Sequence, residues 1–277
     1  MSPPAPAYPA DPADPHAPVS LHLRPTAELA ERVLLPGDPG RALALAQTLI
    51  VEPRMFNHHR GLWGYTGPAR LDGEQLTIQS TGMGGPSAAI VLHELIALGA
   101  RRAVRVGTCG ALRPDLALGD LVVVRESICL DGASRALVAG ERRLPDRPIG
   151  SPIVQHPTSG SVEDPVDLRS VADPGLTDAL RSAAPTDAHA GAVVSVDLFY
   201  DDVRPSDAAT DAIAIEMEAA TLFAVGARAG IPVGCVLAVS DTFDTRGART
   251  RIDDHALLAA AEAMGAVAVA ALGAAKA

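Results

Sequence analysis

A strand, helix, strand unit with a glycine-rich loop at each turn occupies residues 75 to 112, and this pattern constrains the fold more than any other stretch. Leu76 and Ile78 alternate with polar neighbours, which is the period of a half-buried strand. Pro86 follows the first glycine loop at a predicted helix start, because its fixed φ suits the first turn. Apolar residues then recur at helical spacing as far as Gly99, which ends the helix. The chain is therefore predicted to be built from α/β units.

The second strand of this unit ends in the sequence RVGTCG, which brings together Arg105, the Thr108 hydroxyl and glycine N–H groups. The carboxyl end of a strand is the usual ligand side of an α/β sheet. A second glycine loop, PGDPGR at residues 36 to 41, opens another predicted helix and carries Arg41. A helix N-terminus offers unpaired N–H donors and partial positive charge, which suits a phosphate. We predict an anion site here, although such a loop taken alone is more often an ordinary turn.

Composition narrows the functional classes. For 277 residues, an aromatic content of 3% and an even spread of Ala, Val and Leu favour one α/β domain. The formal charge of −10 argues against a nucleic-acid surface, which is marked by a basic patch. The three cysteines, Cys109, Cys129 and Cys235, have no CxxC spacing and indicate neither a disulfide framework nor a zinc site.

No run approaches the ~20 apolar residues needed to span a bilayer, and the N-terminus lacks the regions of a signal peptide. We therefore expect a cytoplasmic protein that does not contact a membrane. Residues 1 to 19 are rich in Pro, Ala and Asp and are predicted to be a disordered tail. Residues 20 to 277 are predicted to form a single domain, from which the charged, proline-broken stretch 139 to 175 extends as a surface excursion.

Two acids flank one methionine at a predicted strand-to-helix junction, in Glu216-Met217-Glu218. The two side chains point in different directions, so at most one is an ordinary charge at a helix N-terminus, and the other needs a partner. Phe199 and Tyr200 follow another predicted strand. Packing in the core explains this aromatic pair as well as a binding role does.

Ser240 and Asp241 stand at the end of an apolar strand predicted over residues 233 to 239. An aspartate at this place is either a functional acid or merely a helix cap or turn residue. Three arginines follow in a predicted loop: Arg246, Arg249 and Arg251.

Seven short motifs occur in one order along the chain: LLPGDPGRA, RGLWGYTG, STGMGGPS, RVGTCGA, DLFY, IEMEAAT and AVSD. In this combination the chain resembles the nucleoside phosphorylase family typified by bacterial hexameric purine nucleoside phosphorylase and uridine phosphorylase. The resemblance covers nearly all of residues 20 to 277 except 139 to 175. It implies a three-layer α/β/α domain around a mixed, partly closed central sheet, and the alternation of strands and helices agrees with that fold independently.

The resemblance also implies the site residues. The implied phosphate contacts are Gly37, Arg41, Arg105 and Thr108, together with Arg60 from a neighbouring subunit. The implied nucleoside contacts are His22 of the neighbour at the ribose 5′-hydroxyl, Met83, Glu216, Met217 and Glu218 at the ribose, and Phe199, Tyr200, Cys109, Gly110 and Ser240 at the base. Asp241 matches the catalytic acid of purine-specific members, and an arginine assists it; Arg251 is taken as that partner, with Arg249 and Arg246 as alternatives.

The chemistry of this family agrees with these residue types. In phosphorolysis, phosphate itself attacks the anomeric carbon, so no Ser-His-Asp or Cys-His arrangement is expected. Three arginines can hold a phosphate dianion and aim it at the sugar. The resemblance implies inorganic phosphate as co-substrate, no cofactor and no metal, and a homohexamer (a trimer of dimers) in which His22 and Arg60 act in the neighbouring active site.

Two specificity classes stay open. The motif STGMGGPS and residues 130 to 134 look closer to uridine phosphorylases, whereas DLFY, the short link to Glu216 and Asp241 look closer to purine enzymes. The Gln and Arg with which uridine enzymes read the pyrimidine edge have no clear counterpart. The sequence therefore favours reversible phosphorolysis of purine (deoxy)ribonucleosides to the free base and (deoxy)ribose 1-phosphate, with uridine phosphorylase as the alternative.

Two further hypotheses use the same fold differently. A nucleoside hydrolase of the adenosylhomocysteine nucleosidase type would replace phosphate by water, but water needs no cradle of Arg41, Arg60 and Arg105. A non-catalytic nucleoside-binding protein would have no need to keep Asp241 and Glu218. Both hypotheses rank below a phosphorylase.

Overall fold

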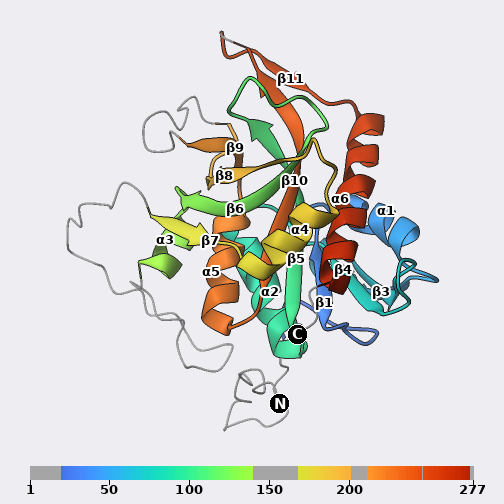
Figure 1. The fold of residues 1–277 in the computed structure, drawn as a ribbon. Helices are drawn as coiled ribbons and strands as arrows, with labels where there is room; N and C mark the ends of the chain where they lie inside the picture. The colour runs from blue at the N-terminus through green and yellow to red at the C-terminus, as the bar shows by residue number, and fades with distance from the viewer. Residues whose placement is uncertain (1–19, 140–167, 201–210, 245, 275–277) are drawn as a thin grey trace.

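The computed structural model in Figure 1 describes four ranges of the chain: residues 20 to 139, 168 to 200, 211 to 244 and 246 to 274. The predicted tail over residues 1 to 19 lies outside these ranges, as does most of the predicted excursion. The described residues form a central mixed sheet with helices on both faces. The predicted three-layer α/β/α class is confirmed.

The described strands belong to one mixed sheet in the order β11-β10-β6-β8-β9-β5-β1-β4-β3-β2, with β7 paired to β6. A short 3₁₀ helix, η1, lies between β2 and β3. The bounds are β1 (Arg32–Leu35), β2 (Arg54–Asn57), η1 (His59–Gly61), β3 (Gly64–Pro68), β4 (Gln75–Gln79), β5 (Arg102–Ala111), β6 (Leu121–Cys129), β7 (Arg169–Val171), β8 (His189–Ser195), β9 (Ala212–Glu216), β10 (Val233–Phe243) and β11 (Arg249–Arg251).

The sheet closes on itself at one end. Strand β10 pairs antiparallel with β6 and also parallel with β5, at the other end of the path through β8 and β9. These five strands therefore form a ring, while β1, β4, β3 and β2 extend from β5 as an open wing. This closure accounts for the partly closed sheet that the family resemblance implies.

Six helices of the described residues cover the two faces: α1 (Pro39–Leu49), α2 (Gly85–Leu98), α3 (Gly132–Val138), α4 (Pro174–Ala183), α5 (Ala219–Ala229) and α6 (Asp254–Ala274). In β10, Cys235 and Leu237 pack with α2 and α5, whereas Val236 and Ala238 pack with α1, α4 and α6. Successive side chains of a strand alternate between its faces, so a continuous apolar run supplies both cores. Figure 1 shows α1 and α6 together on one side, away from α3 and α5.

Local signals place the two helices that follow glycine loops. The Asp38 side chain caps α1 by accepting a hydrogen bond from the Arg41 N–H at 2.7 Å. Pro86 lies in the first turn of α2, and Gly99 ends the helix in the left-handed conformation with φ of 118°. The predicted limits of α2 are confirmed.

Four segments differ from the sequence expectation. Strand β5 continues through the RVGTCG motif to Ala111, and β10 continues to Phe243. The arginine-rich segment expected as a loop forms β11, antiparallel to β10. All three residues of β11 are exposed, so an apolar pattern could not reveal the strand. Residues 168 to 175 differ from a surface excursion, since they contain β7 and the start of α4 and bury Ser170 and Ala172.

Helix α6 corrects the expectation that no run approaches membrane-spanning length. It contains 21 residues and reaches a mean hydropathy of 1.9, which is long and apolar enough to cross a membrane by these two measures. Packing explains its apolar character here: Met264 and Leu272 are fully buried. A Cβ at Gly265 would lie 2.7 Å from the side chains of Leu45 and Leu49, so α6 approaches α1 closely at this glycine.

Candidate active site

Arg105 is a buried cation on the central strand β5, with an exposed fraction of 4%. A Cβ at Gly107 would lie 2.9 Å from the Cζ atom of Arg105, so the glycine leaves room for the guanidinium along the strand. Burial acts to lower the pKa of Arg105, but the carboxylates of Glu218 and Glu216 outweigh burial and raise it. Arg105 is therefore a permanent positive charge held inside the protein.

Glu218 joins Arg105 to the glycine loop before α2. Its Oε2 accepts a hydrogen bond from Nη2 of Arg105, and its Oε1 accepts one from the Gly84 N–H at 2.5 Å. Gly84 has φ of 83°, a backbone conformation that favours glycine. Three elements distant in sequence thus meet at one carboxylate: the loop before α2, strand β5 and the N-terminus of α5.

Glu216 faces inward rather than into open space. Its carboxylate is fully buried, accepts a hydrogen bond from the Ser195 hydroxyl, and lies 3.3 Å from Nε of Arg105. It also accepts hydrogen bonds of 2.9 Å from the N–H groups of Glu218 and Ala219. Burial raises the pKa of Glu216, and the charge of Arg105 opposes this shift. The carboxylate therefore anchors Arg105 and the start of α5.

Arg41 and Arg251 complete a cluster of positive charge around Arg105. Burial lowers the pKa of Arg41, and the nearby charges of Arg105 and Arg251 lower it further, whereas Asp38 and Glu218 act in the opposite direction. Among the described residues, Nη1 of Arg105 has no hydrogen-bond partner.

The glycine loop of residues 36 to 41 approaches this Nη1 atom. A Cβ at Gly37 would lie 4.0 Å from Nη1 of Arg105 and 3.2 Å from the carbonyl oxygen of Gly82, so the two glycine loops meet beside it. Thr108 is partly exposed further along β5. The cluster offers N–H donors and positive charge of the kind that a phosphate requires.

Asp241 lies on β10 at a β-bulge. The pairing of β10 with β5 shifts between Val239 and Asp241, which places Ser240 as the extra residue of the bulge. The Ser240 hydroxyl donates to Oδ2 of Asp241 at 2.6 Å, and Nε of Arg249 donates to Oδ1 at 2.6 Å. Nη1 of Arg251 lies 3.8 Å from the same Oδ1. Among the three candidate arginines, Arg249 therefore makes the direct hydrogen bond.

The aromatic pair lies at the surface of the same region. Phe199 is 51% exposed and Tyr200 is 93% exposed, so neither is a core residue. Their rings meet edge to face with centroids 5.0 Å apart. The Cζ atom of Arg249 lies 4.5 Å from the centroid of the Phe199 ring, which is a cation–π arrangement. Arg249 thus connects Asp241 with Phe199.

Sequence reasoning missed Phe243 and Ser195. A Cβ at Gly110 would lie 3.2 Å from the Phe243 ring, so Phe243 borders the expected base pocket. Phe243 lies two residues after Asp241, and such residues share one face of a strand. A predicted strand that continued to residue 243 would therefore have placed Phe243 beside Asp241. Ser195 carries no sequence signal, because its role depends on the pairing of β8 with β9.

The remaining predicted site residues of this region, Cys109, Met83 and Met217, differ in their exposure to solvent. Cys109 is buried, and burial raises the pKa of its thiol, so it offers a neutral surface rather than a nucleophile. Met83 is 85% exposed and Met217 is partly buried. In the part of the chain that the structure describes, no group of three or more His, Cys, Asp or Glu residues is arranged to hold a metal ion.

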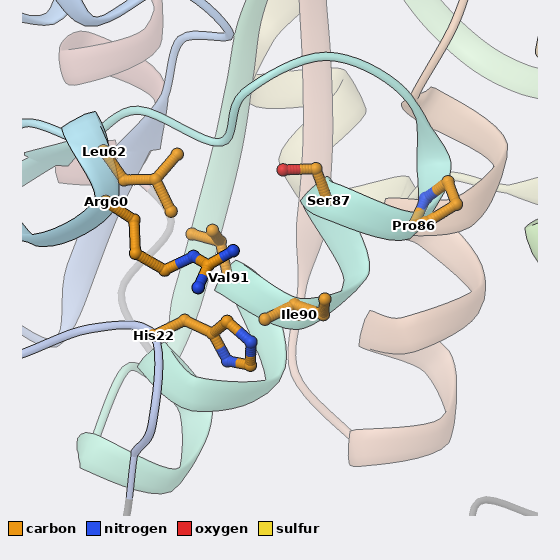
Figure 2. A pocket seen from close by; sticks show the side chains of 7 residues that line it. All are labelled: His22, Arg60, Leu62, Pro86, Ser87, Ile90 and Val91. Carbon is orange, nitrogen blue, oxygen red and sulfur yellow. The ribbon is translucent and has the colours of Figure 1, made fainter. Parts of the chain in front are cut away.

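His22 and Arg60 line a separate pocket of about 240 Å³ between the N-terminal segment and α2. Figure 2 shows both side chains directed into this pocket, with Ile90 of α2 beside the His22 ring. Arg60 has φ of 59° and is exposed. Neither side chain pairs with Arg41, Arg105 or Asp241 among the described residues. The other residues that line the pocket are Leu62, Pro86, Ser87 and Val91.

Comparison with known proteins shows the family to which the chain belongs. A family model described as the phosphorylase superfamily matches residues 31 to 273. A DeoD-type purine nucleoside phosphorylase of Geobacillus kaustophilus (strain HTA426) is 33% identical over 227 residues, which cover 80% of this chain and 86% of the relative. Proteins of the same description are 33% identical in Oceanobacillus iheyensis (77% of this chain, 83% of the relative) and in Jannaschia sp. (strain CCS1) (77% and 83%).

Proposed function

Because the chain belongs to the phosphorylase superfamily, we propose that it is a purine nucleoside phosphorylase. It cleaves purine (deoxy)ribonucleosides reversibly to the free base and (deoxy)ribose 1-phosphate, as expected of an enzyme of purine salvage. The similarity to DeoD-type relatives over about 80% of the chain supports the purine class over the uridine class. The observation that carries the proposal is the cluster of Arg105, Arg41 and Glu218 where two glycine loops meet.

Phosphate binds to the positive side of this cluster. Arg105 offers the unpaired Nη1 and Arg41 offers a guanidinium whose pKa is lowered by burial and by neighbouring cations, so a dianion relieves their mutual repulsion. The backbone at Gly37 and the Thr108 hydroxyl add neutral donors. Held in this way, a phosphate oxygen is aimed at the anomeric carbon, which supplies proximity and orientation.

Glu218 serves the sugar. As the phosphate oxygen forms its bond to the anomeric carbon, the bond to the base nitrogen breaks, and positive charge develops on the ribosyl group. The Glu218 carboxylate and the phosphate stabilise that charge. The hydrogen bond from the Gly84 N–H holds Glu218 in place. Glu216 holds Arg105 through an ion pair, and Arg105 in turn binds Glu218.

Asp241 serves the leaving base. The purine takes the electron pair of the broken bond and is stabilised by a proton at N7. Asp241 donates this proton from its carboxylic acid form as general acid, and Arg249 stabilises the carboxylate that remains. Hydrogen bonds from Ser240 and Arg249 fix the plane of its carboxyl group. Phe199, Phe243 and the backbone at Gly110 form the walls for the base.

We also propose a cytoplasmic homohexamer, a trimer of dimers, with phosphate as co-substrate and neither a metal nor an organic cofactor. The separate pocket of His22 and Arg60 supports a role for these residues in the active site of a neighbouring subunit. A monomer at the working concentration of the enzyme would contradict this part of the proposal.

The test is an assay of inosine, adenosine, 5′-methylthioadenosine and uridine, each with and without phosphate, that follows the free base and ribose 1-phosphate. Phosphate-dependent release of a purine is expected. Release of uracil alone would favour the uridine class, and release without phosphate would favour a hydrolase. Binding of nucleosides without any release would favour a non-catalytic protein.

A further inference from the structure

Glu94 is a buried carboxylate outside the site described above. It lies within α2 and is 4% exposed. The N–H groups of Leu21 and His22 donate to its Oε1 at 3.1 and 3.0 Å, and the N–H groups of His22 and Leu23 donate to its Oε2 at 3.0 and 2.7 Å. A buried charge is costly unless it is paired and hydrogen-bonded, and these donors compensate Glu94.

The same carboxylate contacts the His22 ring. Nδ1 of His22 lies 2.7 Å from Oε1 of Glu94. A carboxylate can only accept hydrogen bonds, so Nδ1 must carry a proton. In the neutral ring, Nε2 is then the acceptor. The orientation of the ring and its tautomer are both set by Glu94.

The segment around His22 has few other attachments. The carbonyl oxygen of His22 lies 3.1 Å from Nδ1 of His59, and the Arg24 N–H donates to Asn57 at 2.8 Å. Residues 20 to 23 belong to no helix or strand, so Glu94 holds a segment that secondary structure does not support. The His22 side chain stays 31% exposed and faces the pocket of Figure 2.

We propose that Glu94 is a positioning residue that fixes His22 as a hydrogen-bond acceptor, so that the enzyme selects nucleosides whose 5′ group is a hydroxyl donor. This inference rests on the proposed function, in which His22 meets the 5′ end of the nucleoside in a neighbouring site. An acceptor at Nε2 bonds a hydroxyl but gains nothing from a 5′-hydrogen or a 5′-thioether, which cannot donate. The preferred substrates are therefore 5′-hydroxyl nucleosides.

The first measurement needs no substrate. The ¹⁵N shifts of the His22 ring, on the high-pH plateau of its titration, report which nitrogen carries the proton. The wild-type protein should show the Nδ1–H tautomer. Replacing Glu94→Gln should shift the population toward Nε2–H, because the amide oxygen is needed by the backbone donors and the amide NH₂ then faces the ring. Glu28→Gln, an exposed glutamate, is the control and should change nothing. An unchanged tautomer in Glu94→Gln would overturn the proposal.

The second measurement compares kcat/KM for inosine and 5′-deoxyinosine. The wild-type preference for inosine should fall about tenfold in Glu94→Gln, as expected for the loss of one hydrogen bond between His22 and the 5′-hydroxyl. In a His22→Ala background, Glu94→Gln should cause no further fall. Equal losses on both substrates would mean a purely structural role and would contradict the inference.

Two outcomes separate this inference from the proposed function. If the wild-type protein cleaves neither substrate, the proposed function fails, while the tautomer measurement still decides whether Glu94 sets His22. If Glu94→Gln does not fold, Glu94→Asp keeps the charge but withdraws it from the ring by one methylene. It should lower the preference for inosine as well, and an unchanged preference would count against the inference.

Discussion

Nε of Arg249 donates a hydrogen bond to Oδ1 of Asp241 at 2.6 Å, whereas the nearest approach of Arg251 to that atom is 3.8 Å. The two arginines alternate with Thr250 on the exposed edge strand β11. Arg251 also acts electrostatically on Arg41, which belongs to the phosphate cluster. The hairpin of β10 and β11 thus brings Arg249 into a hydrogen bond with Asp241 and leaves Arg251 close to both Asp241 and Arg41; we propose that Arg249 serves the acid and Arg251 the phosphate.

This assignment predicts different kinetic effects. Arg249→Ala should lower kcat on inosine about 100-fold with little change in the KM for phosphate. The general acid Asp241 then loses the hydrogen bond that orients its carboxyl group and stabilises the carboxylate left after proton transfer. Arg251→Ala should mainly raise the KM for phosphate. Arg246→Ala, which removes an exposed side chain of the same hairpin, is the matched control. Steady-state kinetics with both substrates varied will decide, and a reversed pattern would restore Arg251 as the partner of Asp241.

Arg41 and Arg105 should differ in their effect on stability. Arg41→Ala should raise the KM for phosphate without loss of stability, because burial disfavours its charge and the hydrogen bond that Arg41 donates to Asp38 comes from its backbone N–H, which the variant keeps. Arg105→Ala should raise that KM and also lower the free energy of unfolding by about 3 to 5 kcal/mol, since two buried carboxylates lose their partner. Urea unfolding of both variants provides the measurement. Equal stability of the two would refute the buried ion network.

Gly107→Ala should act through Arg105. The added Cβ would lie 2.8 Å from Nη2 of Arg105, so the guanidinium must move away from Glu218. We expect a loss of stability of about 1 to 3 kcal/mol, as for overpacking of a core. The KM for phosphate should rise as well. The control Gly73→Ala tests an exposed glycine with positive φ, whose effect should be confined to stability. An unchanged KM in Gly107→Ala would separate the glycine from the anion site.

The raised pKa of Glu216 leads us to expect that the free energy of unfolding depends on pH. Burial raises its pKa in the folded protein, so on acidification Glu216 takes up a proton in the folded state before it does so in the unfolded state. Between the unfolded and folded pKa values, stability therefore falls as pH rises. Glu216→Gln cannot titrate, so the free energy of unfolding of this variant relative to wild type should increase as pH rises above about 4.3, the usual pKa of a glutamate. Denaturant unfolding across this range measures the trend, and a constant or decreasing difference would be the contrary result.

Much of the fold follows from local patterns in the chain. Helix α5 begins at Ala219 and ends at Ala229, because its apolar period is bounded by polar Glu218 and by Gly230. The glycine loops before α1 and α2 and most of the buried strand β10 are likewise evident from their residue types. The cation at position 105 and the acid at 218 stood out because charged residues are rare next to such apolar runs.

The sequence by itself determined the elements, their order and the residue types that a phosphate and a sugar require, because helix and strand periods are encoded over a few neighbouring residues. Only the tertiary structure decided which of them meet. The pairing of β10 with both β5 and β6, the contact of Arg249 with Asp241, and the convergence of Glu94 on His22 join residues by pairing and packing. The last of these spans 72 positions. No local period records such contacts, since they depend on how the sheet closes and on which side chains burial then brings together.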